Sequence, residues 1–193
     1  MVQDERVEVA DGIALRALVR GAEHAGSSVP FVLVHGLASN AHLWDGVAQH
    51  LVSLGHASAA IDLRGHGPAG RHHAVDVPGA FAFDAVAADI VTVIKSLGWD
   101  RPVVVGQSWG GNVVVEVAAR NADAVRGIVC VDGGTIELRH YFDDFDACAE
   151  RLRPPPLVGT PVADIERVLR ALHPDWPESG ITGQLANFEV RAD

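Results

Sequence analysis

The sequence predicts an α/β protein, in which a mostly parallel, doubly wound sheet is followed by an all-helical cap. Short apolar runs alternate with segments of helical periodicity as far as residue 131. This alternation is typical of parallel strands with helices on both faces of the sheet. After residue 135 only helical patterns remain. We therefore expect a core at residues 1–135 and a helical cap at residues 136–193.

The first predicted elements are a hairpin and a buried strand. Apolar residues alternate with polar or small ones over 7–9 and 13–19, on either side of Asp11-Gly12. That pattern predicts two antiparallel strands at one edge of the sheet. Phe31–Val34 is an uninterrupted apolar run, as expected for a strand buried on both faces. The helix expected next has the apolar face Leu43, Val47, Leu51 and Leu54.

The rest of the chain is predicted from the same two periodicities. Further core strands are expected at 57–61, 103–105 and 125–131, and core helices at 81–97 and 110–120. The breaker-rich segment 68–78 is predicted to be a loop. Cap helices are expected at 143–152, at 162–172 with Thr160-Pro161 as its cap, and as a short helix around Ile181, Leu185 and Phe188.

Composition excludes several classes of function. The 193-residue chain has a net charge of −10, which argues against nucleic acid and anionic membrane as partners. No apolar run approaches the ~18 residues of a membrane span. The polar N-terminus lacks the apolar core of a signal peptide, and the two cysteines, Cys130 and Cys148, are expected to be free thiols in the cytoplasm. No two of the ten histidines are four residues apart, and we predict neither a metal site nor a cofactor.

The central motif is Gly106-Gln-Ser108-Trp-Gly110, which follows a predicted strand and precedes a predicted helix. This G-x-S-x-G spacing is that of a nucleophile elbow. A strand that turns sharply into a helix forces its apical residue into strained backbone angles, and side chains at the flanking positions would collide. The helix N-terminus behind the serine favours negative charge nearby. The pattern therefore predicts a serine nucleophile at residue 108.

The other polar motifs also follow predicted strands. His35-Gly36, the segment Asp62–Gly67 and Asp132 each come directly after an apolar run. The carboxyl ends of parallel strands share one edge of the sheet, where α/β proteins bind their ligands. Asp132 is the candidate acid; the alternative is that its carboxylate holds the Gly133-Gly134 turn.

Together these motifs resemble those of an α/β-hydrolase with a helical cap. The resemblance rests on His35-Gly36, on Asp62-x-Arg64-Gly65-His66-Gly67 and on the serine motif, in that order. It implies that Ser108 is the acyl-accepting nucleophile. It also implies that the backbone N–H groups of Leu37 and Trp109 form the oxyanion hole, which stabilises the charge that develops on the substrate oxygen.

The chain departs from the family pattern in its histidine. The family places its base on a loop after the last strand, and no histidine stands in that position here. His35 and His66 are expected to be structural, and His140 and His173 to be solvated or to line a pocket in the cap. We therefore expect the chain to be truncated before its last strands, with an exposed apolar edge that a completing chain or a second copy would cover.

A serine in place of an aspartate argues against the dehalogenase and epoxide-hydrolase branches, which the chain otherwise resembles. Hydrolysis of an ester or related acyl bond is the first expectation, and carbon–carbon bond hydrolysis and perhydrolase chemistry remain open. The substrate is expected to be small and apolar. Its predicted pocket consists of His35, Gly36, Leu37, Trp44, Trp109, Tyr141, Phe142, Phe145 and Trp176. The alternative for each apolar residue of this set is packing in the core or the cap.

Two non-catalytic interpretations remain open. The absent histidine favours a scaffold that binds a small hydrophobic molecule without turning it over, whereas the serine elbow argues against it, because a binder needs no strained serine. An interaction fragment that uses the exposed sheet edge is the second alternative.

Overall fold

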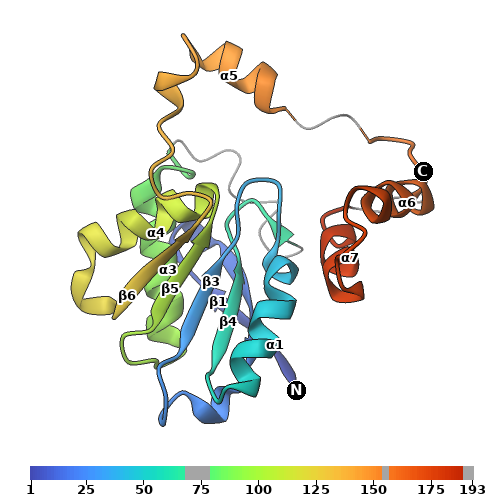
Figure 1. Ribbon diagram of the computed structural model, residues 1–193. Helices are drawn as coiled ribbons and strands as arrows, with labels where there is room; N and C mark the ends of the chain where they lie inside the picture. Colours follow the sequence, from blue (N-terminus) through green and yellow to red (C-terminus); the bar gives the residue numbers. More distant parts are fainter. Residues whose placement is uncertain (68–78, 154–156, 189–193) are drawn as a thin grey trace.

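The computed structural model describes residues 1–67, 79–153 and 157–188 (Figure 1). These residues form a six-stranded sheet with the order β1-β2-β4-β3-β5-β6. Strands β4, β3, β5 and β6 are parallel, and the hairpin of β1 and β2 joins β4 in antiparallel pairing. The strands are β1 (Val2–Glu8), β2 (Ala14–Arg20), β3 (Phe31–Val34), β4 (Ser58–Asp62), β5 (Val103–Gln107) and β6 (Gly127–Val131).

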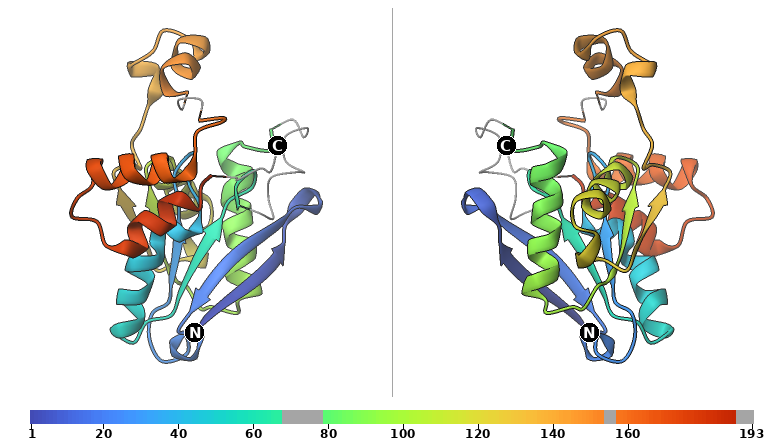
Figure 2. Two further views of the ribbon diagram at one scale, coloured as in Figure 1. Left: turned by 90° about the vertical axis from the view of Figure 1, so that its right-hand side faces the viewer. Right: turned by 90° about the vertical axis from the view of Figure 1, so that its left-hand side faces the viewer.

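Helices cover both faces of the sheet (Figure 2). One face packs against α3 and α4, and the other against α1. The α-helices are α1 (Asp45–Ser53), α3 (Phe83–Ser96), α4 (Trp109–Arg120), α5 (Phe145–Leu152), α6 (Val162–Leu172) and α7 (Glu178–Leu185). Short 3₁₀ helices are η1 (Ala10–Gly12), η2 (Ala22–His24), η3 (Ala41–Trp44), η4 (Ala122–Ala124) and η5 (Leu138–His140). The predicted doubly wound α/β fold is confirmed. The loop expected at 68–78 lies outside the described residues.

The apolar core is divided by the sheet into two layers. The larger layer joins the sheet to α3 and α4, and includes Leu15, Val34, Ile90 and Val113. The smaller layer joins the sheet to η3 and α1, and includes Leu18, Leu33, Trp44, Ala48 and Val105. Alternate residues of each inner strand supply opposite layers, as the pleat requires.

The predicted apolar face of α1 is wrong at three of its four positions, since only Leu51 packs against the smaller core layer. Leu43, Val47 and Leu54 are 38%, 47% and 61% exposed, whereas Trp44 and Ala48 are buried against the sheet. The small side chain of Ala48 lets the helix approach the sheet closely. Trp44, Ala48 and Leu51, at regular helical spacing, then form the inner stripe, and Leu43, Val47 and Leu54 lie outside it.

Strand β6 is an open edge. It pairs with β5, and no other described strand lies beside it. Val129 and Val131 are 44% and 41% exposed, and Cys130, a free thiol, is also exposed. An uncharged, β-branched edge of this kind is a site for pairing with a further strand. The expected exposed apolar edge is therefore present.

After residue 135 the described chain contains only helices. Figure 1 shows α5 beyond the carboxyl ends of the strands and α6 and α7 on the side of α1. Asp144 caps α5, because its Oδ1 accepts a hydrogen bond from the N–H of Ala147 at 2.8 Å; α5 has no buried residue. Helix α6 has the predicted bounds, but no side chain caps it. Helix α7 packs against η3 and α1, where Ile181 is 1% exposed.

Candidate active site

Ser108 is the single residue between strand β5 and helix α4. Strand β5 ends at Gln107 and α4 begins at Trp109. Ser108 itself has φ 52° and ψ −123°, a combination that L-residues rarely adopt and that surrounding structure must hold in place. The predicted strained turn is therefore present at the predicted residue.

Each flanking glycine is required by a close backbone approach. A Cβ on Gly106 would overlap the carbonyl of Gly110, so the two glycines do meet across the turn. A Cβ on Gly110 would instead overlap the carbonyl of His35, at the end of β3, and lie 2.8 Å from the carbonyl oxygen of Val34. The second glycine thus lets α4 start against the neighbouring strand, a reason that the motif alone does not give.

The end of β6 supports Ser108 from the other side. The N–H of Ser108 donates to the carbonyl of Val131 at 2.9 Å, and a Cβ on Gly133 would overlap the Ser108 carbonyl. Between these residues Asp132 is exposed and has φ 50°. The carboxylate of Asp132 therefore projects from the strand end next to the one that carries the serine.

The Gly133-Gly134 turn is held by Asn112 of α4. Its Oδ1 accepts from the N–H of Gly134 at 3.0 Å and from that of Ile136 at 3.3 Å, while its Nδ2 donates to the carbonyl of Ile136 at 2.8 Å. The Asp132 carboxylate makes no hydrogen bond to the described residues. The structural role considered for Asp132 thus belongs to Asn112, and the Asp132 carboxylate is left available.

The turn after β3, residues 36–40, lies directly beside the serine. A Cβ on Gly36 would be 3.0 Å from the Cβ of Ser108. Within the described chain, the backbone N–H groups of Leu37 and Trp109 donate to no protein acceptor. Trp109 is the first residue of α4, where N–H groups have no partner inside the helix. Two free donors therefore flank Ser108, as the oxyanion-hole prediction requires.

His35 supports this turn from inside the protein. Its ring is fully buried; Nε2 accepts from the N–H of Leu63 at 3.1 Å and Nδ1 lies 2.7 Å from the carbonyl of Gly36. These partners require a neutral ring with its proton on Nδ1. Burial lowers the pKa of His35 to about 3. His35 therefore fixes the turn and does not line a pocket.

Residues of the Asp62–Gly67 segment hydrogen-bond to η3 and to α3. Asp62 Oδ1 accepts from the N–H of Ala41 at 2.6 Å. The guanidinium of Arg64 donates two hydrogen bonds of 2.6 Å to the carboxylate of Asp89 on α3 and one of 2.8 Å to the carbonyl of Ala80. Both ion-pair partners are almost fully buried, so this bidentate pair anchors the middle of α3 to the turn after β4.

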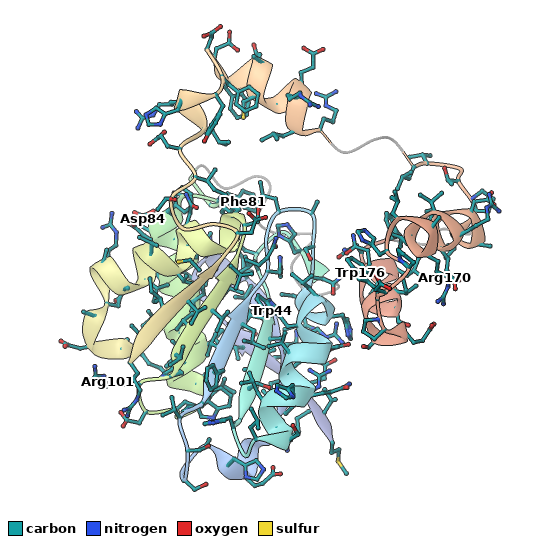
Figure 3. All side chains as sticks on the ribbon, viewed as in Figure 1. Trp44, Phe81, Asp84, Arg101, Arg170 and Trp176 are labelled. Carbon is teal, nitrogen blue, oxygen red and sulfur yellow. The ribbon has the colours of Figure 1, made fainter. Side chains whose placement is uncertain are left out.

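Not all predicted pocket residues converge on Ser108. Trp44 packs in the core layer under α1 (Figure 3). Tyr141 is 76% exposed, and Phe142 lines a groove with Ala147 and Arg151 of α5. Leu37 is 56% exposed at the turn beside the serine. Only Gly36, Leu37 and Trp109 of the predicted pocket therefore border Ser108.

An aromatic residue of the predicted core helix 81–97 lies at the site. Phe83, the first residue of α3, packs against the indole of Trp109 with ring centroids 5.7 Å apart and planes 31° apart. Its side chain remains 40% exposed. Its position at the end of a breaker-rich segment was the available signal, because helix starts after such loops often face a ligand site.

No histidine of the described chain hydrogen-bonds Ser108. His42 does pair with a carboxylate: its Nδ1 lies 2.9 Å from Oδ2 of Asp45, which also binds Arg20 of β2. Strands β4 and β3 separate β2 from the serine-bearing β5, so this pair lies away from Ser108. Among the described residues no group of histidine, cysteine and acidic side chains could hold a metal ion.

Among the described residues, no helix is long and apolar enough to cross a membrane.

A groove lined by Ser27, Trp99, Asp100 and Arg126 lies at the amino ends of β3 and β5, at the edge opposite Ser108. It therefore does not belong to the candidate site.

The chain matches a protein-family model. The family described as alpha/beta hydrolase fold matches residues 29–173. This range includes the turn after β3, the Asp62–Gly67 segment and the serine elbow.

Individual relatives have several activities. The chain is 35% identical over 107 residues to Esterase Rv0045c of Mycobacterium tuberculosis, covering 55% of this chain and 34% of the relative. It is 30% identical over 127 residues to Epoxide hydrolase A of the same organism, covering 66% and 38%. A solved thioesterase domain from the curacin biosynthetic pathway superposes with a TM-score of 0.71 at 21% identity, covering 96% of this chain and 67% of that one. The chain thus spans less than half the length of these two curated relatives.

Proposed function

The chain belongs to the α/β-hydrolase fold family, and we propose that it carries the serine nucleophile of an enzyme that hydrolyses an ester or related acyl bond. The observation that carries this proposal is the backbone of Ser108, held at φ 52° and ψ −123° between β5 and α4. Strain of this kind persists where the surrounding structure maintains it and is concentrated at functional sites.

In the proposed reaction the Oγ of Ser108 attacks the carbonyl carbon and loses its proton to a base. The substrate oxygen becomes an oxyanion, which the N–H groups of Leu37 and Trp109 stabilise. Collapse of this intermediate expels the alcohol, which takes up the proton, and leaves an ester on Ser108. Water then attacks that ester and releases the acid.

We assign the triad acid to Asp132 and place the base outside the described residues. Asp132 follows the strand beside β5, and its carboxylate makes no hydrogen bond within the described chain. A base that binds both Ser108 and Asp132 would complete the nucleophile–base–acid arrangement. A second copy of the chain, at the β6 edge, is the proposed source of that base.

The presence of serine supports acyl transfer over the chemistry of the epoxide-hydrolase branch, whose nucleophile is a carboxylate. The name of one relative, Esterase Rv0045c, agrees with this choice, and that of another, Epoxide hydrolase A, does not. Carbon–carbon bond hydrolysis and perhydrolase chemistry would use the same serine and are alternatives to ester hydrolysis.

The substrate is proposed to be small and apolar. The half-exposed rings of Phe83 and Trp109 and the side chain of Leu37 border the serine, and they offer apolar contact area with few polar groups. Residues 136–193 are proposed to act as the cap. The two cysteines are free, which supports a reducing, cytoplasmic location.

A second candidate is a scaffold that binds a small hydrophobic molecule without turnover. The lack of a histidine bonded to Ser108 in the described residues supports it.

Hydrolysis of p-nitrophenyl butyrate by the wild-type chain and by Ser108→Ala separates the two candidates. The proposal expects p-nitrophenol release by the wild type that the substitution abolishes. Equal release by both proteins, together with saturable binding of the ester, would support the binding scaffold.

A further inference from the structure

The turn that carries one oxyanion donor is fixed at both ends. At one end Gly36 contacts the side chain of Ser108. At the other end Asn40 is 5% exposed, and its Oδ1 accepts from the N–H of His42 at 2.7 Å. Between them Leu37 is exposed, and Ala38 has φ 52°. A strained, exposed turn depends on its end contacts to keep one conformation.

The Asn40 side chain also contacts the helical segment at the end of the described chain. Its Nδ2 donates to the Oδ1 of Asn187, 147 residues later in the sequence. Because the Oδ1 of Asn40 is committed to a backbone N–H, the Asn40 amide has only its NH₂ group to offer Asn187. Asn187 must therefore present an oxygen.

Helix α7 is seated on the same segment by two further contacts. Ile181 is 1% exposed. Gly183 lies over the carbonyl of His42, where an added Cβ would be 2.7 Å from that oxygen. The contact between α7 and η3 is therefore close-packed, and the bond to Asn187 is made at its edge, next to the turn.

We propose that Asn187 is a positioning residue for the oxyanion hole: through Asn40 it holds the turn that carries the N–H of Leu37 beside Ser108. The inference rests on the proposed function, since it gives that turn its catalytic role. It couples the helical segment to the reaction, because a displacement of α7 would release the turn. Asn187 itself touches no reacting atom.

Amide hydrogen exchange, resolved by residue, tests the structural half of the proposal. Three protected amides report on the turn: Ala41 donates to Asp62, and His42 and Leu43 donate to Asn40. In Asn187→Ala their exchange is expected to rise about fivefold, as for the loss of one hydrogen bond. Asn187→Ser, too short to reach Asn40, serves as a second variant if the alanine variant does not fold.

Two matched variants distinguish loss of the Asn40–Asn187 hydrogen bond from a general effect of substitution near α7. Asn187→Asp keeps an acceptor oxygen and is expected to restore wild-type exchange. Thr182→Ala alters the exposed face of α7, where the hydroxyl donates only to the Glu178 carbonyl of the same helix, and is expected to change nothing at the turn. Unchanged exchange in both Asn187→Ala and Asn187→Ser, or a rise in Asn187→Asp equal to that in Asn187→Ala, would overturn the proposal.

The catalytic half is read from acylation of Ser108 by p-nitrophenyl butyrate. Asn187→Ala is expected to lower the maximal acylation rate about tenfold with little change in the half-saturating concentration, because a displaced donor loses contact with the transition state. An unchanged rate would overturn the catalytic role. A wild type that is not acylated would contradict the proposed function alone, and the exchange result would still decide whether Asn187 holds the turn.

Discussion

Gly36 lies against the side chain of Ser108, with room for a hydrogen and not for a methyl group. A Cβ at residue 36 would be 3.0 Å from the Cβ of Ser108 and 2.6 Å from Oε1 of Gln107. Gly36→Ala is therefore expected to destabilise the fold by about 1–3 kcal/mol and to reduce reaction at Ser108. Gly46→Ala is the control, because nothing lies within 4 Å of its added Cβ. Urea unfolding that ranks the two variants equally would contradict this packing.

Substitution of Asn112 is expected to lower stability, and substitution of Asp132 is expected to lower catalysis. Asn112→Ala removes three hydrogen bonds from the turn after β6 and should lower the free energy of unfolding by about 1–3 kcal/mol. Asp132→Asn removes a charge that makes no hydrogen bond in the described chain, so its stability should stay within ~0.5 kcal/mol of wild type while ester hydrolysis falls. Chemical denaturation and p-nitrophenol release measure the two effects. A large loss of stability in Asp132→Asn would return that residue to a structural role.

The buried imidazole of His35 predicts a loss of stability in acid. Burial lowers its pKa from 6.5 to about 3, so between these values the unfolded chain binds the proton and the folded chain does not. The free energy of unfolding therefore falls as the pH drops from 6.5 towards 3, by up to about 1.4 kcal/mol per pH unit. Denaturant titrations over this range should show a shallower fall in His35→Asn than in wild type. His50→Gln, an exposed position on α1, is the control, and parallel curves for wild type and His35→Asn would exclude this contribution.

The open edge of the sheet predicts association of the isolated chain. Val129→Lys places a charge on β6, and charged side chains oppose strand pairing. Val47→Lys adds the same charge at a comparably exposed position on α1, away from the edge, at 47% against 44% exposure. Static light scattering over a concentration series should show weaker association in Val129→Lys than in Val47→Lys. Equal behaviour would mean that net charge, and not the edge, controls association.

Much of the fold follows from short-range patterns in the sequence. Phe31–Val34 was predicted to the residue, because an uninterrupted apolar run fits only a strand covered on both faces. The elbow was predicted because its two flanking glycines stand where a Cβ would overlap the backbone, a steric limit that holds for any sequence. The face of α1 was missed in part because its buried stripe, Trp44, Ala48 and Leu51, lies next to a stripe of larger aliphatic residues, and periodicity alone does not distinguish the two.

The composition of the site depends on contacts that no short pattern contains. Phe83 fits the apolar stripe of its helix, yet it lies beside Trp109, because the first residues of α3 and α4 come together. Tyr141 was expected in the pocket on its aromatic character, but the chain leads η5 and α5 away from the serine. The bond between Asn40 and Asn187 spans 147 residues, and it depends on how α7 packs against η3.

The central claim is that Ser108 is an activated nucleophile, and a fluorophosphonate probe tests it most directly. The serine oxygen would displace fluoride from phosphorus and leave a stable phosphonyl ester, which intact mass and peptide mapping locate. We predict one adduct per chain, on Ser108, which is absent in Ser108→Ala and slower to form in Gly36→Ala. A folded wild-type chain that gains no adduct, or gains it equally in Ser108→Ala, would contradict the account and favour the binding scaffold.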